Sequence, residues 1–175
     1  MAVIEAIETV YLEVDAASVT FSSLGSYKDL QLVMSAHSIY TGYSFHDIYI
    51  EFNGSGGSDY ANHKFYAYND TSKTVTKYSG LSSISAGGIS AGPNSDGSLY
   101  APTTVNIFDY LSTNKVTALN NTSGIEDAGT SGQSAVQFVG GMWNSTAALT
   151  SIKVMPPSSS FKRGTTMSLY GIKSS

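Results

Sequence analysis

The sequence predicts an all-β protein with little helix, folded as a single antiparallel domain over residues 1–175. Along most of the chain, hydrophobic residues alternate with polar ones, which is the period of a half-buried strand. Clusters of Gly, Ser, Asn and Pro separate these segments, as turns do between strands. The chain of 175 residues is long enough to bury one core of its own. Roughly eight to ten strands in one domain are typical of a β-sandwich or barrel.

The first predicted strands show the alternation most clearly. Ile7–Val14 has the pattern of a strand, and Asp29–Ala36 alternates between apolar and polar side chains. His46–Phe52 does the same, with Ile48 and Ile50 facing inward. This period of two would not place apolar residues on one face of a helix. We therefore expect three half-buried strands here.

The later strands have weaker patterns. Lys64–Tyr68 is aromatic on both faces, and Ser151–Met155 ends at Pro156, which has no N–H to donate to a sheet. Val105–Leu111 also allows a helical turn, and the pattern leaves this alternative open. Four further strands are predicted: Val75–Tyr78, Thr104–Asp109, Lys115–Asn120 and Ala135–Met142.

Two segments rich in small residues are predicted to lie outside the strands. Gly54–Asp59 falls short of the phosphate-binding glycine patterns and is interpreted as a hairpin turn. Ser82–Gly97 contains many Ser and Gly residues and little to bury, so we expect a long flexible loop that projects from the body or lies against a partner.

The last segment, Thr165–Ile172, is predicted to be a strand that pairs beside the first one. Gly164 would permit a tight turn before it, and Gly171 would allow a neighbouring backbone to approach closely. Such pairing would tie the ends of the chain together and shield two sheet edges. We expect no tail that could serve as a stalk or anchor.

The composition excludes several classes of function. Charged residues make up 13% of the chain, against roughly 25% in an ordinary soluble domain, and the net charge is −4. No basic cluster is available for nucleic acid, and no apolar run is long enough to span a membrane. Cysteine is absent, and the first residues do not form a secretory signal. An uncharged polar surface suits a protein whose faces are covered by neighbours, or one that contacts sugars.

No catalytic or cofactor-binding motif is found, so we predict no catalytic residues, no metal ligands, no cofactor and no enzyme activity. His37, His46 and His63 lie on separate segments without a metal-binding spacing. A calcium site formed by Asp47, Glu51, Asp59 and Asn53 is less favoured than solvated carboxylates at strand edges. A carbohydrate-cleaving enzyme is a third hypothesis, because a carboxylate pair is recognised by its separation in space.

Aromatic residues cluster around Gly42 and again after the glycine-rich turn, and exposed tyrosines suit contact surfaces and sugar stacking. About half of them are expected to fill the core. Trp143 is expected in the core or in a subunit interface. The aromatic residues concerned are Tyr40, Tyr43, Phe45, Tyr60, Phe65, Tyr66 and Tyr68.

The order of several short segments resembles small virion proteins of tailed phages, especially those of aquatic bacteria. The end of the chain, Phe161–Ile172, carries the most recognisable part, and His37 stands where the family often has arginine. The other segments are Ile7–Val10, Ser18–Leu24, Tyr27–Leu30, Asn53–Gly54 and Trp143–Ile152.

The resemblance implies a jelly-roll-like sandwich and a virion structural protein. We expect a capsid decoration (cement) protein that binds the outer lattice of the major capsid protein, self-associates, with a trimer as the expected state, and is assembled in the bacterial cytoplasm. The alternative is a receptor-binding or fibre module that recognises cell-surface glycans. The sequence does not identify the residues of the interaction surface.

Overall fold

The computed structural model describes residues 3–42, 45–68, 72–91, 99–125 and 134–173. These residues form strands and turns, with no helix among them. The strands are β1 (Val3–Tyr11), β2 (Val19–Phe21), β3 (Asp29–Ser38), β4 (Phe45–Phe52), β5 (Tyr60–Tyr68), β6 (Ser72–Leu81), β7 (Ile84–Ala91), β8 (Ala101–Phe108), β9 (Thr117–Ile125), β10 (Ala135–Trp143), β11 (Ile152–Met155) and β12 (Thr166–Lys173). The all-β prediction is confirmed.

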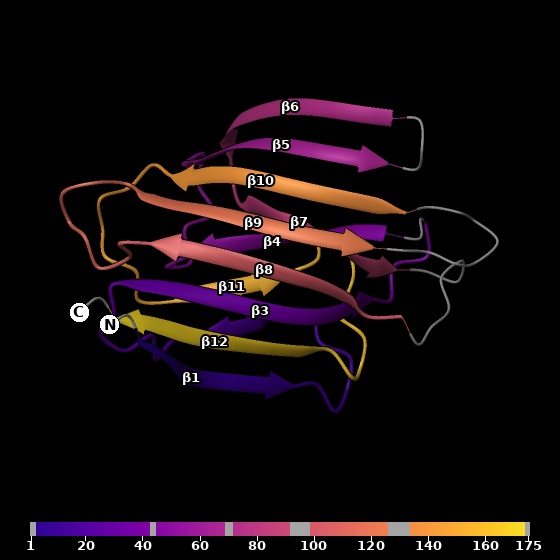
Figure 1. Ribbon diagram of the computed structural model, residues 1–175, viewed down its shortest axis with the longest axis horizontal. Coiled ribbons are helices and arrows are strands. Elements are labelled where there is room, and N and C mark those ends of the chain that lie inside the picture. The colour runs from indigo at the N-terminus through magenta and orange to yellow at the C-terminus, as the bar shows by residue number, and fades with distance from the viewer. Residues whose placement is uncertain (1–2, 43–44, 69–71, 92–98, 126–133, 174–175) are drawn as a thin grey trace.

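The strands form two layers of unequal size (Figure 1). The long layer has the order β1-β12-β3-β8-β9-β10-β5-β6, and the short layer has the order β2-β11-β4-β7. The two layers are hydrogen-bonded to each other where the end of β3 pairs with β7, at His37–Ser90 and Ser38–Ala91. That pairing is parallel, whereas the other strand pairs are antiparallel. The fold is therefore an antiparallel, jelly-roll-like sandwich.

The core lies between the layers and follows the predicted alternation. Leu30, Leu32 and Met34 of β3 are buried, and so are Ile48 and Ile50 of β4. Burying each such side chain stabilises the fold by roughly 1.5–3 kcal/mol. Trp143 is also buried and packs in this core. The segment 105–111 is not helical, because β8 continues to Phe108 and a turn follows it.

The terminal strands pair as predicted, from Val3–Lys173 to Tyr11–Thr166. The pairing shields β12, which lies between β1 and β3, but β1 itself remains an edge strand, so the prediction that two edges are shielded was wrong. Gly171 makes room for a side chain rather than a backbone. A Cβ atom at Gly171 would lie 2.3 Å from the ring of Tyr27.

The prediction of a long loop at 82–97 was wrong for residues 84–91, while residues 92–97 lie outside the described residues. Ile84–Ala91 forms β7, and every residue of this strand is buried. Its small side chains reflect close packing. Gly87 has a φ of 103°, and a Cβ atom there would lie 2.6 Å from Ser123 Oγ of the facing layer. Small residues thus mark a strand with neighbours on both sides.

The glycine-rich segment after β4 does contain a tight turn, but it does not form a hairpin. Asn53 and Gly54 have φ values of 53° and 67°, and the Ser55 N–H donates to Phe52 O at 2.9 Å. However, β4 and β5 do not pair; β4 pairs with β7 and β11, and β5 pairs with β6 and β10. The segment therefore carries the chain from the short layer to the long layer. This crossing places β4 opposite β5.

Candidate functional site

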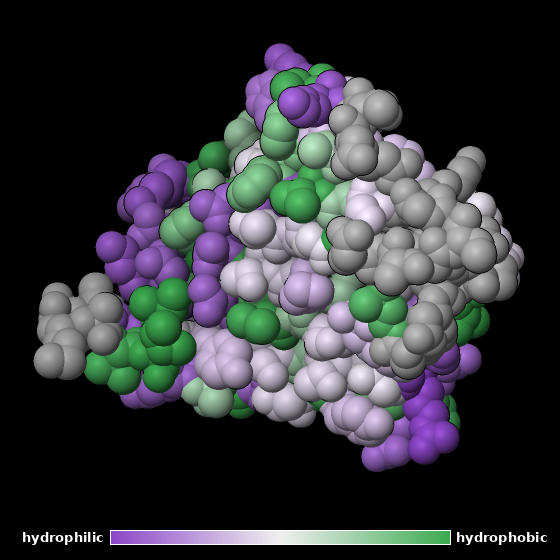
Figure 2. All heavy atoms as spheres, turned by 45° about the vertical axis from the view of Figure 1, so that its right-hand side comes forward, coloured by the Kyte–Doolittle hydropathy of each residue, from purple (hydrophilic) through white to green (hydrophobic). Residues whose placement is uncertain are grey.

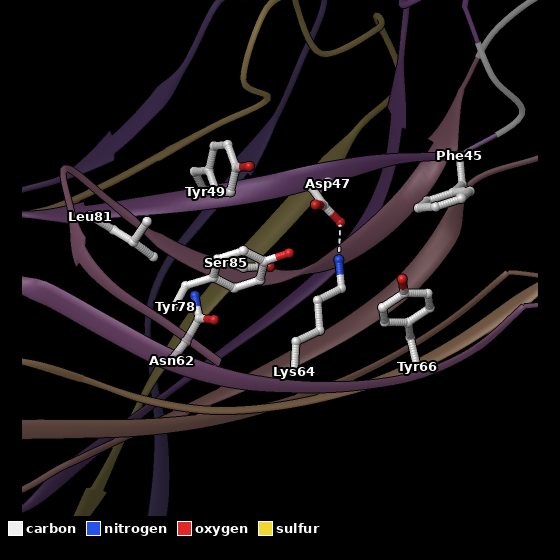
Figure 3. Close-up of a pocket in the computed structure, with 9 residues that line it drawn as sticks. All are labelled: Phe45, Asp47, Tyr49, Asn62, Lys64, Tyr66, Tyr78, Leu81 and Ser85. Carbon is white, nitrogen blue, oxygen red and sulfur yellow. Dashed lines mark hydrogen bonds and ion pairs between the residues drawn. The ribbon is translucent and has the colours of Figure 1, made fainter. Parts of the chain in front are cut away.

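A pocket of about 410 Å³ lies between β4 and the end of the long layer formed by β5 and β6 (Figure 3). Alternate residues of β4 and of β5 point into it, as the period of two requires. The lining residues are Phe45, Asp47, Tyr49, Asn62, Lys64, Tyr66, Tyr78, Leu81 and Ser85. A volume of this size is within the roughly 300–1,000 Å³ range of small-molecule sites.

An ion pair crosses the pocket and joins the two layers. Lys64 Nζ donates to Asp47 Oδ1 at 2.6 Å, and the ammonium lies 5.4 Å from the centre of the Tyr66 ring (Figure 3). The side chains of Lys64 and Asp47 are 11% and 27% exposed. Because the carboxylate neutralises the ammonium, the pair adds hydrogen-bonding capacity to the pocket without adding net charge.

The tyrosines supply aromatic surface and hydroxyl groups. Burial raises the pKa of the Tyr49 phenol, and the nearby Asp47 carboxylate and Tyr78 raise it further. Tyr49 therefore stays a neutral phenol, which can both donate and accept a hydrogen bond. Tyr78 is 48% exposed, so its ring remains accessible from solvent.

Two buried polar groups of the pocket have no hydrogen-bond partner. Asn62 and Ser85 are each 5% exposed, yet Asn62 Oδ1 and Ser85 Oγ are unpaired. Gln137 and Asn121, which do not line the pocket, also have unpaired side-chain atoms. A buried polar atom without a partner costs about 1–3 kcal/mol. A partner supplied from the pocket would remove this cost at Asn62 and Ser85.

The outer face of the long layer, which points away from the short layer, is a second candidate surface (Figure 1). The central strands β8, β9 and β10 contain no charged residue. One cross-strand row of this face is made of uncharged side chains throughout: Val33, Thr104, Thr122, Phe138, Phe65 and Val75. Among these, Phe65, Phe138 and Val75 are 41%, 49% and 71% exposed.

The neighbouring row of the outer face contains an amide ladder and a hollow. Gln31 Nε2 donates to Asn106 Oδ1 at 2.8 Å, and Asn106 Nδ2 donates to Asn120 Oδ1 at 2.9 Å. A shallow hollow lies on this face next to Asn120. It is located over Gly140, where an added Cβ atom would meet nothing within 4 Å. In Figure 2 weakly hydrophilic and hydrophobic residues cover the middle of the visible surface, and strongly hydrophilic ones lie mostly at its margins.

The structure separates the residues of the hypothetical calcium site. Asp47 pairs with Lys64, and Glu51 pairs with Lys153 at 3.2 Å, so neither is the solvated edge carboxylate that the sequence favoured. Asp59 accepts from Ser55 at 3.1 Å. Asn53 Oδ1 accepts from the Thr150 N–H at 2.7 Å. Among the described residues, no three His, Asp or Glu side chains are grouped as metal ligands.

Two of the three histidines, His37 and His46, are buried. Burial is the main cause that lowers the pKa of His37 and of His46, so both are neutral at pH 7. His46 Nδ1 lies 3.1 Å from Ser38 Oγ, which is the geometry of a serine with a potential base. However, Ser38 has no exposed surface and its Oγ accepts the Tyr40 N–H. No substrate can reach this serine in the folded protein.

The described aromatic residues of this group are mostly half-buried, contrary to the expectation that about half fill the core. Of the described members of that group, only Tyr60 is buried. Phe45 and Tyr66 line the pocket, and Phe65 lies on the outer face. Tyr43 lies outside the described residues.

Sequence reasoning did not identify the pocket. Its members come from four strands, and the pairing that would bring them together is not visible in any one segment. One available signal was β5, where Asn62 and Lys64 alternate with His63 and Phe65, so polar residues occur on both faces of an interior strand. Among the described residues, no helix has the length and hydrophobicity needed to cross a membrane.

Comparison with known proteins shows only weak structural likeness. No family model matches the chain, and no curated protein matches it. Scytalido-glutamic peptidase bound to a peptide-based transition-state analogue has a TM-score of 0.30 at 12% identity, covering 91% of this chain and 65% of the peptidase. SCP-B, a peptidase of the Eqolisin family in complex with a tripeptide, has a TM-score of 0.29 at 12% identity, covering 91% and 64%. The exoplasmic/lumenal domain of VIP36 has a TM-score of 0.16 at 10% identity, covering 96% and 82%. The chain thus spans just under two thirds of both peptidases, and likeness at this level carries no argument about function.

Proposed function

We propose that this protein is a non-enzymatic virion structural protein, namely a capsid decoration protein that attaches to the outer surface of the major capsid protein and stabilises the phage head. The outer face of the long layer, whose central strands β8, β9 and β10 contain no charged residue, is the observation that carries the proposal. The resemblance of the sequence to small phage virion proteins supports this class of assembly. In this proposal the protein resides on the capsid surface.

The outer face has the size and chemistry of an attachment surface. Eight strands spaced ~4.8 Å apart, with about eight residues each at ~3.3 Å per residue, give a face of roughly 900 Å². One partner contributes about 800 Å² to a standard protein interface. Depletion of charge and exposed aromatic residues are typical of interface cores, and Phe65 and Phe138 supply the latter.

The absence of charge on the central strands predicts how attachment responds to salt. Ionic interactions between exposed groups weaken as salt screens them. Contacts made by Thr122, Phe138 and their neighbours would be insensitive to this screening. We therefore expect the protein to stay attached to capsids when the salt concentration is raised.

Attachment is tested by co-sedimentation with capsids that lack the protein. Phe138→Asp and Thr122→Asp place a charge in the middle of the face and should reduce attachment at least tenfold, because the carboxylate would lose its water on docking. Val14→Asp is the matched control, since Val14 is exposed but lies outside the long layer's strands. If all three variants attach like the unmodified protein, the outer face is not the attachment surface.

Loss of the protein should also lower the heat resistance of the capsid, since attachment adds contacts between neighbouring subunits. Unchanged resistance together with no attachment to empty heads would contradict the proposed function. Self-association into a trimer stays a prediction, and analytical ultracentrifugation of the free protein tests it.

A further inference from the structure

We infer that the pocket between β4 and β5 is a binding site for an uncharged saccharide, with room for roughly one or two sugar rings. The inference does not depend on the proposed capsid attachment, because it rests on the other face of β5. Three observations support it: the unpaired Oδ1 of Asn62, the ion pair between Asp47 and Lys64, and the exposed ring of Tyr78.

The unpaired polar groups indicate that the ligand carries hydroxyl groups. Asn62 Oδ1 is an acceptor without a donor, and Ser85 Oγ can donate or accept. Both atoms are buried and belong to residues that line the pocket. An apolar ligand would leave them unpaired, at a cost of about 1–3 kcal/mol for each. Hydroxyl groups on a ring would satisfy both once the neighbouring side chains shift to admit them, because each atom has less than 1 Å² of accessible surface.

The ion pair limits the charge of the ligand. Asp47 engages the Lys64 ammonium through Oδ1, so neither charge is free to attract an ion. Among the described residues that line the pocket, these two are the charged ones. The remaining acceptor positions of the carboxylate and the remaining protons of the ammonium can still bind hydroxyl groups, and hydrogen bonds to charged groups are stronger than those between neutral groups. The chemistry therefore favours a neutral polyhydroxyl ligand over a phosphate or a metal ion.

The aromatic rings supply the apolar contact that a sugar ring requires. Tyr78 is about half exposed, while Tyr49 and Tyr66 are half-buried, and all three rings lie among the lining side chains in Figure 3. A pyranose ring has faces of C–H groups, which pack on an aromatic ring while the hydroxyl groups at its margin remain free to hydrogen-bond. The combination of tyrosine rings with Asn and Asp side chains fits such a ring.

The position of the pocket leaves it open on a docked protein. On β5, Asn62, Lys64 and Tyr66 point into the pocket, while His63 and Phe65 point to the outer face of the long layer. A protein attached through its outer face would therefore present the pocket away from the surface beneath it. The ligand is either a free oligosaccharide or the same sugars within a bacterial surface polysaccharide.

The test uses the full chain on a glycan array that contains neutral and acidic bacterial saccharides, followed by titration of the best neutral one. The unmodified protein should bind a neutral saccharide with a Kd of about 1 mM or tighter. Tyr78→Ala should weaken binding at least tenfold. The matched control is Tyr11→Ala, because Tyr11 is also about half exposed but lies on β1 at the other edge of the layer, and it should bind normally.

Asn62→Leu separates a ligand-binding role from a structural one. Leucine has a similar size and removes a buried polar group that has no partner, so the free energy of unfolding should stay the same or rise. Saccharide binding should nevertheless fall at least tenfold. Comparing free saccharide with purified surface polysaccharide in the same titration identifies the source of the ligand.

The inference is overturned if no neutral saccharide binds, if acidic saccharides alone bind, or if Phe138→Asp abolishes binding while Tyr78→Ala and Asn62→Leu do not. Capsid attachment of the pocket variants should be normal. A failure of attachment in the unmodified protein would reject the proposed function and leave the saccharide measurement unaffected.

Discussion

The ion pair between Asp47 and Lys64 should contribute more to stability than an ordinary surface pair. Its two atoms are 2.6 Å apart, and the side chains are 27% and 11% exposed. Removing one partner of a fully buried ion pair lowers the free energy of unfolding by about 3–5 kcal/mol, whereas an exposed pair contributes about 0–1 kcal/mol. Burial here is intermediate, so Lys64→Met should lower the free energy of unfolding by about 2 kcal/mol. Asp47→Asn should cost more, about 3 kcal/mol, because it leaves the Lys64 ammonium, the more buried of the two groups, without a counter-charge.

Urea denaturation of the single variants and of the double variant measures this coupling. The loss of unfolding free energy in the double variant should be smaller than the sum of the two single losses by at least about 1 kcal/mol, because the double variant leaves no charge unpaired. Lys115→Met is a control at the same distance, because Lys115 and Asp109 are also 2.6 Å apart but 60% and 37% exposed. It should cost less than about 1 kcal/mol. Equal costs for Lys64→Met and Lys115→Met, or additive effects in the double variant, would refute the argument from burial.

Two further predictions concern pH and backbone conformation. Because burial lowers the pKa of His37 and of His46, the unfolded chain takes up protons below about pH 6.5 while the folded chain resists, so stability should fall as the pH decreases. Each histidine contributes a slope of at most about 1.4 kcal/mol per pH unit, and urea denaturation between about pH 7.5 and 5.5 should give a flatter profile for His46→Gln; an unchanged profile would contradict this. Gly87→Ala should cost at least about 3 kcal/mol, because it combines a φ of 103° with a Cβ atom 2.6 Å from Ser123 Oγ. Gly54→Ala, with a φ of 67° and open space, should cost about 1 kcal/mol in the same measurement, and a similar loss at both positions would contradict the role of close packing at Gly87.

The strands that could be predicted from the sequence are those with one buried face and one solvent-exposed face. In β3 and β4 the burial of Leu30, Leu32, Ile48 and Ile50 produces the period of two directly. β7 gives no such signal because neighbours cover both of its faces, and its residues are small enough to fit between them. Low hydrophobicity therefore indicated a loop where the chain is in fact fully buried.

The candidate pocket could not be predicted because it depends on a change of layer. The glycine-rich segment between Phe52 and Tyr60 was interpreted as a hairpin, which would have paired β4 with β5. The Tyr60 hydroxyl instead accepts the Phe52 N–H at 2.7 Å and is buried between the layers. This contact fixes the crossing, and the crossing places Asp47 opposite Lys64. No spacing along the sequence encodes that juxtaposition.

The two proposed surfaces meet in one strand, and this makes them separable by experiment. Successive residues of β5 alternate between the pocket and the outer face, so Lys64 and Phe65 are adjacent in sequence yet serve opposite sides of the layer. A substitution at Phe65 or Phe138 changes the face that would contact a capsid and leaves the walls of the pocket in place. A substitution at Asn62 or Tyr78 does the reverse. Because hydrogen bonds to β6 and β10 hold β5 on both sides, occupancy of one surface is not expected to displace the other. Under both proposals a docked protein would still be able to bind a saccharide. A substitution that abolishes one of the two activities and leaves the other unchanged would assign its residue to the corresponding surface.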